Sequence, residues 1–331
     1  MRNLSNLIRV LADGEFHTGV SLARYCGVSR KTIDEEINRL ATAGVQIEAL
    51  RARGYRIKRR PDLFHAPTIL QMLKPRTRRL LFDIQSLMET GSTNSHLMRQ
   101  GASGAPAGQV CVAEMQTAGK GRRGKEWISP FAANLYMSLL WRFEHYSCGT
   151  DRLSLITALA VADALTALGA QSLALKWPND LYWRYQKLGG ILLEGATQAG
   201  GGAYVVIGIG VNVRMPTFAA EKIDQPWADL TAVLDGNVPS RNLLAARLLD
   251  TIVTAVHSFE HKDELNLPQA WRRYDYLYGE VVELENHAGR QRGTALGIDT
   301  EGRFLLDING RRQAFACGEI RLYTKCVAPN S

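Results

Sequence analysis

The 331-residue chain has no apolar run that approaches the roughly 18 residues of a membrane-spanning helix. Its first residues lack the apolar core and the small-residue cleavage site of a secretory signal. The five cysteines are scattered with no close pair, which argues against both a disulfide framework and a zinc site. A Walker A motif and a G-x-S-x-G elbow are also missing, so neither a P-loop nor a hydrolase triad has support. We therefore expect a cytoplasmic protein with reduced thiols and no membrane partner.

What the sequence does contain is an ordinary globular composition with an uneven distribution of charge. Apolar residues make up 46% and charged residues 22%, which excludes global disorder, and the length suggests several domains. The net charge is +8, but residues 1–80 hold 16 Lys and Arg against 7 Asp and Glu, and the rest of the chain is near neutral. A basic module joined to a neutral body indicates that the N-terminal end binds a polyanion.

The basic N-terminal part has the pattern of a winged helix-turn-helix. Residues 4–11 carry apolar side chains at helical spacing, and a second short helix fits residues 19–25. Ser29 is a suitable N-cap for a third helix that follows a glycine turn. Two short strand patterns, 45–50 and 55–58, are joined by a basic turn and complete the motif as a hairpin.

The third helix and the basic turn carry the side chains that such a motif uses against DNA, because the start of the recognition helix reaches base edges and the wing lies beside it. We expect DNA contacts from Ser29, Arg30, Lys31, Thr32, Arg51 and Arg53. Three carboxylates at 34–36 follow one turn later, and they would oppose phosphate unless they lie on the outer face of the helix or beside the groove. The alternative is a module that only modulates the rest of the chain.

Strand and helix patterns mix along the centre of the chain, which is typical of an α+β or α/β domain. Short strand patterns separated by turns such as Asn309-Gly310 replace them near the C-terminus, and these predict a small all-β barrel or sandwich. The expected domains are therefore residues 1–61, 62–268 and 269–331.

Glycines and cations alternate in GKGRRGK, residues 119–125. This segment formally matches G-x-G-x-x-G, but it lies between two strand patterns and does not open a helix, which argues against a dinucleotide fingerprint. Glycines let the backbone approach a ligand, and the cations neutralise phosphate or carboxylate charge. A solvated basic loop is the alternative.

Three further positions have both a functional and a structural interpretation. KWPND at 176–180 ends a strand pattern and can also be read as an Asx-type turn. Lys187 precedes two glycines, but taken alone it is a surface lysine. Asn212 lies in a strand pattern, where an amide either satisfies neighbouring backbone or holds a ligand.

Six segments, taken in order, resemble one family closely. They are GSTN (91–94), EMQTAGKGRRGKEW (114–127), NLYMSLLW (134–141), KWPNDLY (176–182), KLGGILLE (187–194) and GIGVNV (208–213). This set is similar to the biotin–protein ligases, and with the N-terminal module it resembles the bifunctional members that are also biotin operon repressors. The resemblance spans essentially the whole chain. It implies an α+β multidomain protein with a winged helix-turn-helix, a central mixed-sheet domain like that of class II synthetases, and a C-terminal SH3-like β-barrel.

The resemblance implies a biotin–acetyl-CoA-carboxylase ligase that works in two steps. Biotin and MgATP give biotinoyl-5′-AMP and pyrophosphate, and a specific lysine of the biotin carrier protein of acetyl-CoA carboxylase then displaces AMP. The adenylate is also the corepressor that promotes a homodimer and its binding to operator DNA. Two alternatives stay open, namely a winged-helix regulator that senses a ligand without ligase activity, and a lipoate or other acyl ligase of the related fold.

The functional residues of the family are carried over to matching positions of this sequence. The resemblance implies that biotin is bound by Ser92, Thr93, Asn94, Gln116, Lys120, Gly121, Arg122 and Lys187. It implies that ATP and the adenylate are bound by Arg122, Arg123, Trp127, Lys176, Asn179, Lys187, Asn212 and Trp227. Lys187, Arg122 and Asp180 are the implied catalytic residues, with Asp180 as the base near the incoming amine and with Asn179 and Asp180 near Mg²⁺. The family's loop commonly reads G-R-G-R, and here Lys120 replaces the first Arg, which keeps the charge but loses bidentate geometry.

Overall fold

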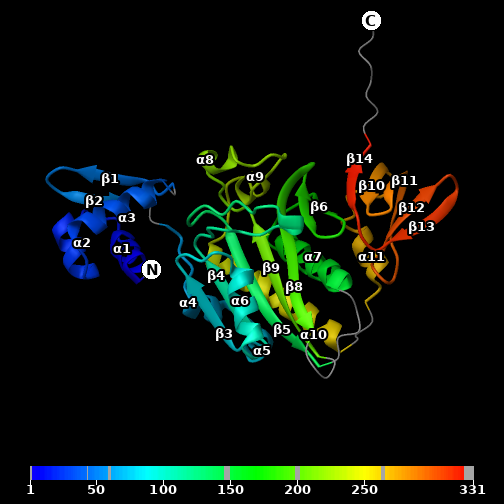
Figure 1. Ribbon diagram of the computed structural model, residues 1–331, viewed down its shortest axis with the longest axis horizontal. Coiled ribbons are helices and arrows are strands. Elements are labelled where there is room, and N and C mark those ends of the chain that lie inside the picture. The colour runs from blue at the N-terminus through cyan, green and yellow to red at the C-terminus, as the bar shows by residue number, and fades with distance from the viewer. Residues whose placement is uncertain are drawn as a thin grey trace, which may run out of the picture.

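The computed structural model describes residues 2–42, 44–58, 61–144, 150–197, 202–261 and 265–323. Within them the chain forms a helical N-terminal body, a central body around a mixed sheet and a C-terminal antiparallel sheet, arranged in a row (Figure 1). This α+β organisation confirms the predicted fold class. The domain limits stay predictions, and residues 59 and 60 at the first limit lie outside the described residues, as do Cys148 and Cys326. No helix in the described ranges is long and apolar enough to cross a membrane.

The described part of the N-terminal body has three helices and a two-stranded hairpin, as predicted. Its elements are α1 (Arg2–Leu11), α2 (Gly19–Cys26), α3 (Arg30–Thr42), β1 (Ile47–Leu50) and β2 (Gly54–Ile57). The predicted cap is present, because the Ser29 hydroxyl accepts a hydrogen bond from the Thr32 amide at 3.1 Å. Gly27 ends α2 in the left-handed conformation (φ +67°), which glycine adopts without strain. Phe131 of the central body packs into the same apolar cluster as the helices, so the two bodies share a contact.

The central sheet is mixed, as predicted. In sheet order its strands are β3 (Asp83–Leu87), β4 (Gln109–Ala113), β5 (Leu135–Phe143), β9 (Ala203–Val211), β8 (Gln186–Thr197), β7 (Asp180–Trp183) and β6 (Leu173–Lys176). β3 and β4 are parallel, and the other neighbouring pairs are antiparallel. Nearly every residue of β5 and β9 is buried, because both faces of the sheet are covered there.

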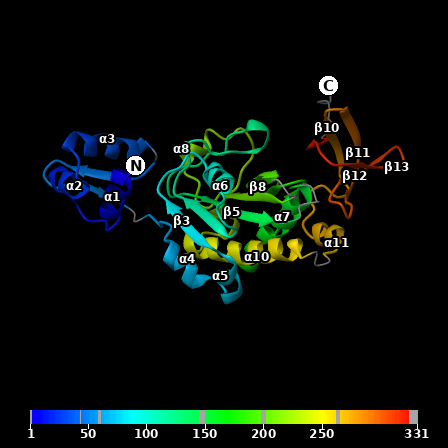
Figure 2. The same ribbon diagram turned by 60° about the horizontal axis from the view of Figure 1, so that its bottom comes forward.

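Helices cover the two faces of this sheet unequally. The long helices α7 (Thr150–Ala167) and α10 (Arg241–Glu260) pack on one face, and α6 (Thr93–Ala102) packs on the other (Figure 2). Successive residues of β5 show the division, since Leu139 belongs to the core shared with α7 and α10, whereas Leu140 clusters with Leu97 of α6. Gly208 and Gly210 of β9 face the α6 side, and the absence of side chains there leaves room above the sheet.

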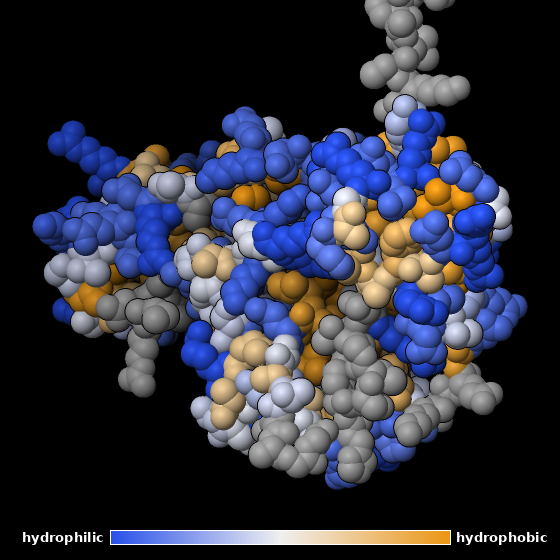
Figure 3. Space-filling view, turned by 45° about the vertical axis from the view of Figure 1, so that its right-hand side comes forward, coloured by the Kyte–Doolittle hydropathy of each residue, from blue (hydrophilic) through white to orange (hydrophobic). Residues whose placement is uncertain are grey.

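The C-terminal part of the described chain confirms the predicted small all-β domain. After α11 (Leu267–Arg272) its strands are, in sheet order, β13 (Arg311–Phe315), β12 (Phe304–Ile308), β11 (Gly289–Ile298), β10 (Val281–Asn286) and β14 (Glu319–Leu322). The segment between α11 and β10 extends the central sheet. The Leu175 amide donates to the Tyr274 carbonyl at 2.6 Å, and the Tyr276 amide donates to the Leu175 carbonyl at 3.0 Å. Figure 3 shows mostly hydrophilic cover on this side of the molecule, with hydrophobic residues gathered beside the C-terminal sheet.

Several short elements have no counterpart in the predicted pattern. They are α4 (Ala66–Met72), α5 (Pro75–Leu80), α8 (Thr217–Ala220), α9 (Leu230–Val233), α11, β7 and β14. Each spans at most 7 residues, which is too short for an apolar period to stand out. Proline at the first turn of α4, α5 and α11 is the local start signal that could have revealed them.

Candidate active site

A pocket of about 500 Å³ lies on the α6 face of the central sheet, between residues 117–127 (the glycine segment), the β6–β7 turn and the start of β14. All the residues predicted to bind biotin, the adenylate or Mg²⁺ line this pocket. They are Ser92, Thr93, Asn94, Gln116, Lys120, Gly121, Arg122, Arg123, Trp127, Lys176, Asn179, Asp180, Lys187, Asn212 and Trp227. The fold therefore brings together positions that the sequence separates widely, while the role of each stays a prediction.

Buried polar side chains form one wall of the pocket at the N-terminus of α6. The Gln116 carbonyl oxygen accepts hydrogen bonds from the Thr93 amide at 2.9 Å and from the Thr93 hydroxyl at 3.2 Å, and the Gln116 amide donates to the Ser129 hydroxyl at 2.9 Å. The Ser138 hydroxyl of β5 lies 2.7 Å from the Thr93 hydroxyl and 2.6 Å from the Asn94 carbonyl oxygen. This wall offers donors and acceptors without net charge, which suits a neutral polar ligand group.

The glycine segment is a narrow hairpin over the pocket. The Gly121 amide donates to the Lys125 carbonyl at 2.7 Å, and the Trp127 amide donates to the Gly119 carbonyl at 2.9 Å. At its tip, Arg122–Gly124 form a single 3-10 turn and no α-helix, in agreement with the predicted context. A Cβ on Gly119 would come within 2.3 Å of the Trp127 carbonyl oxygen, so close backbone approach requires glycine there.

The Trp127 side chain fills the space above β9. Its ring packs on Gly210, where a Cβ would come within 2.6 Å of the ring. The indole N–H is buried and has no hydrogen-bond partner among the described residues. The Lys187 ammonium lies 5.8 Å from the ring centre, within reach of a cation–π interaction. The glycine at 210 is thus explained by aromatic packing.

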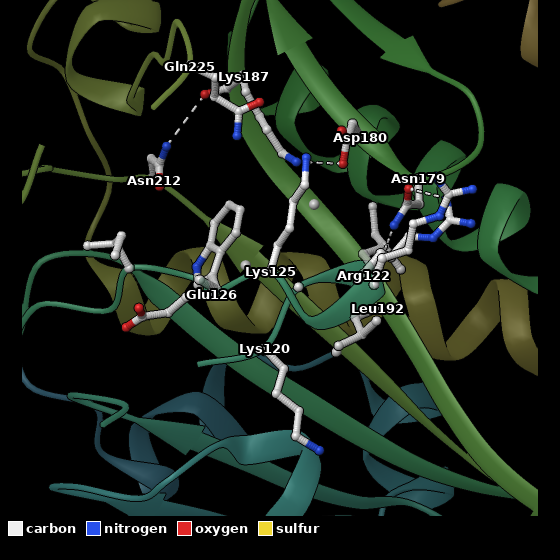
Figure 4. Close-up of a pocket in the computed structure, with 18 of the residues that line it drawn as sticks. Lys120, Arg122, Lys125, Glu126, Asn179, Asp180, Lys187, Leu192, Asn212 and Gln225 are labelled. Atoms are coloured by element: carbon white, nitrogen blue, oxygen red, sulfur yellow. Dashed lines mark hydrogen bonds and ion pairs between the residues drawn. The ribbon is translucent and has the colours of Figure 1, made fainter. Parts of the chain in front are cut away.

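In the pocket, a lysine and an arginine from different elements each contact a side-chain oxygen at the β6–β7 turn (Figure 4). Lys187 Nζ of β8 lies 2.8 Å from Asp180 Oδ1, and Arg122 Nη1 donates to Asn179 Oδ1 at 3.1 Å. Burial lowers the pKa of Lys176, and the nearby Asp180 carboxylate opposes that shift. Several positive groups around few negative ones suit an anionic ligand.

The segment that carries Trp227 is tied to Lys187 and Asn212. The Lys187 amide donates to the Pro226 carbonyl at 2.9 Å, and the Ala228 amide donates to the Lys187 carbonyl at 3.0 Å. Asn212 Nδ2 donates to the Ala228 carbonyl at 3.0 Å. Its Oδ1 is buried with no hydrogen-bond partner in the described part of the chain. The backbone interpretation of Asn212 therefore accounts for its NH₂ group only.

The outer cations of the glycine segment pair with carboxylates that sequence reasoning missed. The Lys120 side chain points away from Lys187 and Asp180 (Figure 4), and its ammonium lies 3.1 Å from Glu194 Oε1. Arg123 lies 3.2 Å from Glu319 of β14. Glu194 ends the KLGGILLE segment, but neither carboxylate has a neighbour in sequence that would reveal its partner. The Lys120 and Arg123 side chains are 45% and 52% exposed, so these pairings do not decide between the ligand-binding and the solvated-loop interpretations.

The residues predicted to contact DNA lie on the surface of the N-terminal body. Five are exposed and Thr32 is half-buried; the exposed ones are Ser29, Arg30, Lys31, Arg51 and Arg53. The Arg53 guanidinium lies 4.5 Å from the centre of the Phe16 ring. Asp34 accepts a hydrogen bond from the Tyr55 hydroxyl at 2.9 Å, so this carboxylate is turned toward the hairpin. Contacts between DNA and the six predicted residues stay a prediction.

Comparisons with known proteins agree with this architecture. Residues 3–56 match the HTH domain family, and residues 88–212 match the Biotin/lipoate A/B protein ligase family. The bifunctional ligase/repressor BirA of Salmonella typhimurium is 36% identical over 96% of this chain and 96% of its own length, and that of Escherichia coli is 35% identical over the same shares. A biotin–acetyl-CoA-carboxylase ligase of Mycobacterium tuberculosis is 36% identical over 70% of this chain and 86% of its own.

Solved structures show the same fold for most of the chain. A biotin protein ligase from Aquifex aeolicus in complex with biotin and ATP covers 72% of this chain and 99% of its own, with a TM-score of 0.63 and 24% identity. The predicted resemblance is confirmed by the sequence relatives, whose identity extends through the N-terminal domain as well as the ligase domain. This chain therefore belongs to the bifunctional ligase/repressor family of biotin–protein ligases.

Proposed function

We propose that this chain activates biotin with ATP to biotinoyl-5′-AMP and transfers the biotinoyl group to one lysine of the biotin carrier protein of acetyl-CoA carboxylase. The observation that carries the proposal is the convergence of Lys187 and Arg122 with the neutral polar wall around Thr93 and Gln116 in a single pocket. One end of the pocket can therefore form hydrogen bonds with the neutral ring system of biotin. The other end presents cations to the anionic groups of the two substrates.

The first step joins two anions, so charge neutralisation and positioning dominate it. A carboxylate oxygen of biotin attacks the α-phosphorus of ATP, a new P–O bond forms, and the bond to the pyrophosphate bridge breaks. Lys187 places an ammonium beside the carboxylate and the phosphoryl oxygens. Arg122 covers the product from the glycine segment and keeps water from it. In the proposed complex the partnerless Asn212 Oδ1 accepts a hydrogen bond from the nucleotide, and Trp227 covers the nucleotide from the pocket lining.

Mg²⁺ enters with the phosphates of ATP and, when bound, offsets their charge. The described residues hold no group of three or more His, Cys, Asp or Glu that could form a metal site. Asn179 and Asp180 nevertheless supply one amide and one carboxylate oxygen on the pocket wall, a donor set that fits an ion bound mainly by phosphate and water. These two residues would hold Mg²⁺ in the proposed complex.

In the second step the carrier lysine attacks the carbonyl carbon of the mixed anhydride. A C–N bond forms, the C–O bond to phosphate breaks, and AMP leaves. The attacking amine must lose a proton, and Asp180 is the proposed base because its carboxylate is the acidic group beside Lys187.

We also propose that the adenylate-bound chain is a homodimer that represses biotin synthesis genes. The exposed cations at the start of α3 and in the wing support DNA binding, and a helix-turn-helix reads two half-sites when two copies are paired. Carrier protein consumes the adenylate, so scarce carrier lets the corepressor persist. Carrier, DNA and substrates meet in the cytoplasm, which is the proposed location.

The ligase proposal is tested by incubating the full chain with labelled biotin, MgATP and a purified carrier domain. We expect label on the carrier, competition by unlabelled biotin and none by lipoate, and loss of at least about 100-fold in Lys187→Ala, because one essential charge is removed. Absence of transfer would reject the enzyme in favour of a ligand-sensing regulator, and competition by lipoate would point to the related acyl ligases.

The repressor proposal is tested by a gel shift on the promoter of the biotin synthesis genes, with sedimentation of the same samples. We expect a salt-sensitive shift that strengthens with biotin plus ATP, together with a dimer under the same conditions. A shift that ignores both ligands would remove the switch, and a monomer that binds equally well would remove the dimer.

A further inference from the structure

Glu194 lies on the side of the glycine segment away from Lys187, and both of its carboxylate oxygens are engaged. We propose that Glu194 is a positioning residue for adenylate formation, with one oxygen holding the glycine segment through Lys120 and the other fixing the amide of Asn94. The proposal rests on the proposed biotin-activating function. It assigns a task to a residue of β8 that the pocket chemistry does not use directly.

The first interaction, between Glu194 and Lys120, restrains the glycine segment. Lys120 Nζ lies 3.1 Å from Glu194 Oε1, and the two side chains are 45% and 28% exposed. Lys120 also forms an isolated backbone bridge with Glu126 on the returning strand, so it is part of the hairpin's own pairing. A restraint on Lys120 therefore restrains the whole turn that carries Arg122. The ion pair is partly solvated, so salt weakens it.

The second interaction decides which way the Asn94 amide faces. Glu194 Oε2 accepts a hydrogen bond from Asn94 Nδ2 at 3.0 Å, and the Leu192 carbonyl accepts another at 3.1 Å. Asn94 Oδ1 lies 2.6 Å from the Ser138 hydroxyl. A carboxylate and a carbonyl can only accept, so the NH₂ group must face β8 and Oδ1 must face Ser138. Oδ1 is then the group that a ureido N–H meets.

Asn94 has no room to compensate by moving. It is 3% exposed, and a Cβ on Gly208 would come within 2.2 Å of Asn94 Oδ1, so the amide already rests against β9. Without Glu194 the Leu192 carbonyl alone holds Nδ2. One carboxylate thus sets the acceptor in the expected biotin subsite and the position of the segment that covers the product.

The two interactions can be separated by substitution. Glu194→Gln keeps an oxygen for Asn94 but removes the charge that Lys120 needs, whereas Glu194→Ala removes both. Lys120→Met removes the ion pair with Glu194 and leaves the Glu194–Asn94 hydrogen bond in place. Lys120→Arg keeps the ion pair, and its planar head adds donors toward the carboxylate.

Hydrogen exchange followed by mass spectrometry on the ligand-free, full-length chain measures the restraint directly, and biotin KM and adenylate release measure its effects. We expect exchange over residues 117–127 and adenylate release to rise roughly 1.5- to 5-fold in Glu194→Gln and in Lys120→Met, the range of a partly exposed ion pair. The double variant Glu194→Gln/Lys120→Met should show no further rise in exchange or in adenylate release. Glu194→Ala should in addition raise biotin KM about tenfold, because a charged hydrogen bond to Asn94 is lost. Lys120→Arg should keep exchange over residues 117–127 at the wild-type level, because the ion pair remains.

Glu285→Gln is the matched control, because Glu285 forms a surface ion pair with Arg290 at 3.5 Å on the C-terminal sheet. It should change none of these quantities. Wild-type exchange in Glu194→Gln, or additive effects in the double variant, would overturn the restraint, and an unchanged biotin KM in Glu194→Ala would overturn the role at Asn94. The exchange measurement needs no ligand, so failure of biotin activation in the wild type would be seen separately.

Discussion

Glu114 and Arg241 form an ion pair in the interior of the protein, where their side chains are 2% and 1% exposed. Glu114 directly follows β4 and lies three positions before the glycine segment, and Arg241 is the first residue of α10. Arg241 also donates from Nη1 to the Asn134 carbonyl at 3.0 Å and from Nε to the Asp62 carbonyl at 2.9 Å. This pair therefore joins the start of the ligase domain to the base of its functional segment.

Removing one partner of this pair should destabilise the protein strongly. Arg241→Met leaves the Glu114 carboxylate buried and unpaired, and we expect a loss of about 3–5 kcal/mol in the free energy of unfolding. The double variant Glu114→Gln/Arg241→Met should recover part of that loss, because no buried charge remains. Urea denaturation of the three proteins measures this. A loss below about 1 kcal/mol in Arg241→Met would show that the interior pair is not a significant restraint.

Arg122→Gly should release the adenylate before transfer. The substitution removes the hydrogen bond to Asn179 at the tip of the glycine segment but leaves Lys187 in place, so activation continues while retention fails. We expect biotin on bystander lysines of an added protein such as serum albumin, measured by streptavidin blot. Asp163→Asn, at a surface ion pair with Arg273 outside the pocket lining, is the control. Labelling equal to that of the wild type would show that Arg122 does not retain the adenylate.

Asp275 should make the domain junction sensitive to pH. Burial raises the pKa of Asp275 to about 6, although the Leu277 amide donates to its Oδ1 at 3.0 Å. The folded state thus holds a proton that the unfolded state, with a pKa of about 4, releases earlier. Stability from this group is greatest below about pH 4, falls as pH rises to about 6, and is constant above.

Asp275→Asn should lack this decline. Between about pH 4 and pH 6, the unfolding free energy of the wild type should fall by up to about 2–3 kcal/mol relative to that of the variant. Urea denaturation at several pH values measures both. Parallel curves for the two proteins over this window would contradict the assignment.

The exposed wing arginines should govern the salt dependence of DNA binding. Arg51→Ala and Arg53→Ala should each reduce the slope of log Kd against log salt by roughly one, on specific and random duplexes alike, because each removes one phosphate contact. Fluorescence anisotropy over a salt series measures the slope. Arg303→Ala, which removes a surface cation that pairs with Asp299 in the turn between β11 and β12, should leave the slope unchanged. An unaltered slope in both wing variants would place the DNA elsewhere.

The sequence predicted the long elements well because their apolar residues recur with a clear period or form unbroken runs. The Ser29 cap and the glycine turn at Gly27 are local signals, and the structure confirms them. The short helices α4 and α5 were not predicted, because a helix of six or seven residues shows no clear apolar period. Tertiary contacts rather than propensity stabilise such elements.

The pocket residues came from recognisable segments, but the pairing of their side chains could not be predicted. Lys120 and Glu194 are 74 positions apart, and Arg123 and Glu319 are 196 positions apart. No local pattern in a single sequence connects such pairs, since the strand order β9-β8-β7 and the placement of β14 bring them together. Conversely, the glycines at 208 and 210 could be noticed in sequence, but only the packing of Asn94 and Trp127 explains them.

The central claim is that the pocket beneath the glycine segment makes biotinoyl-5′-AMP and keeps it. The full-length protein, incubated with biotin, Mg²⁺ and ATP labelled at the α-phosphate and then passed through a gel-filtration column, tests this most directly. The account predicts a stoichiometric amount of label that elutes with the protein, depends on biotin, is lost in Lys187→Ala and is retained in Glu285→Gln. Label that is absent from the protein fraction, or that is retained equally without biotin, would contradict it.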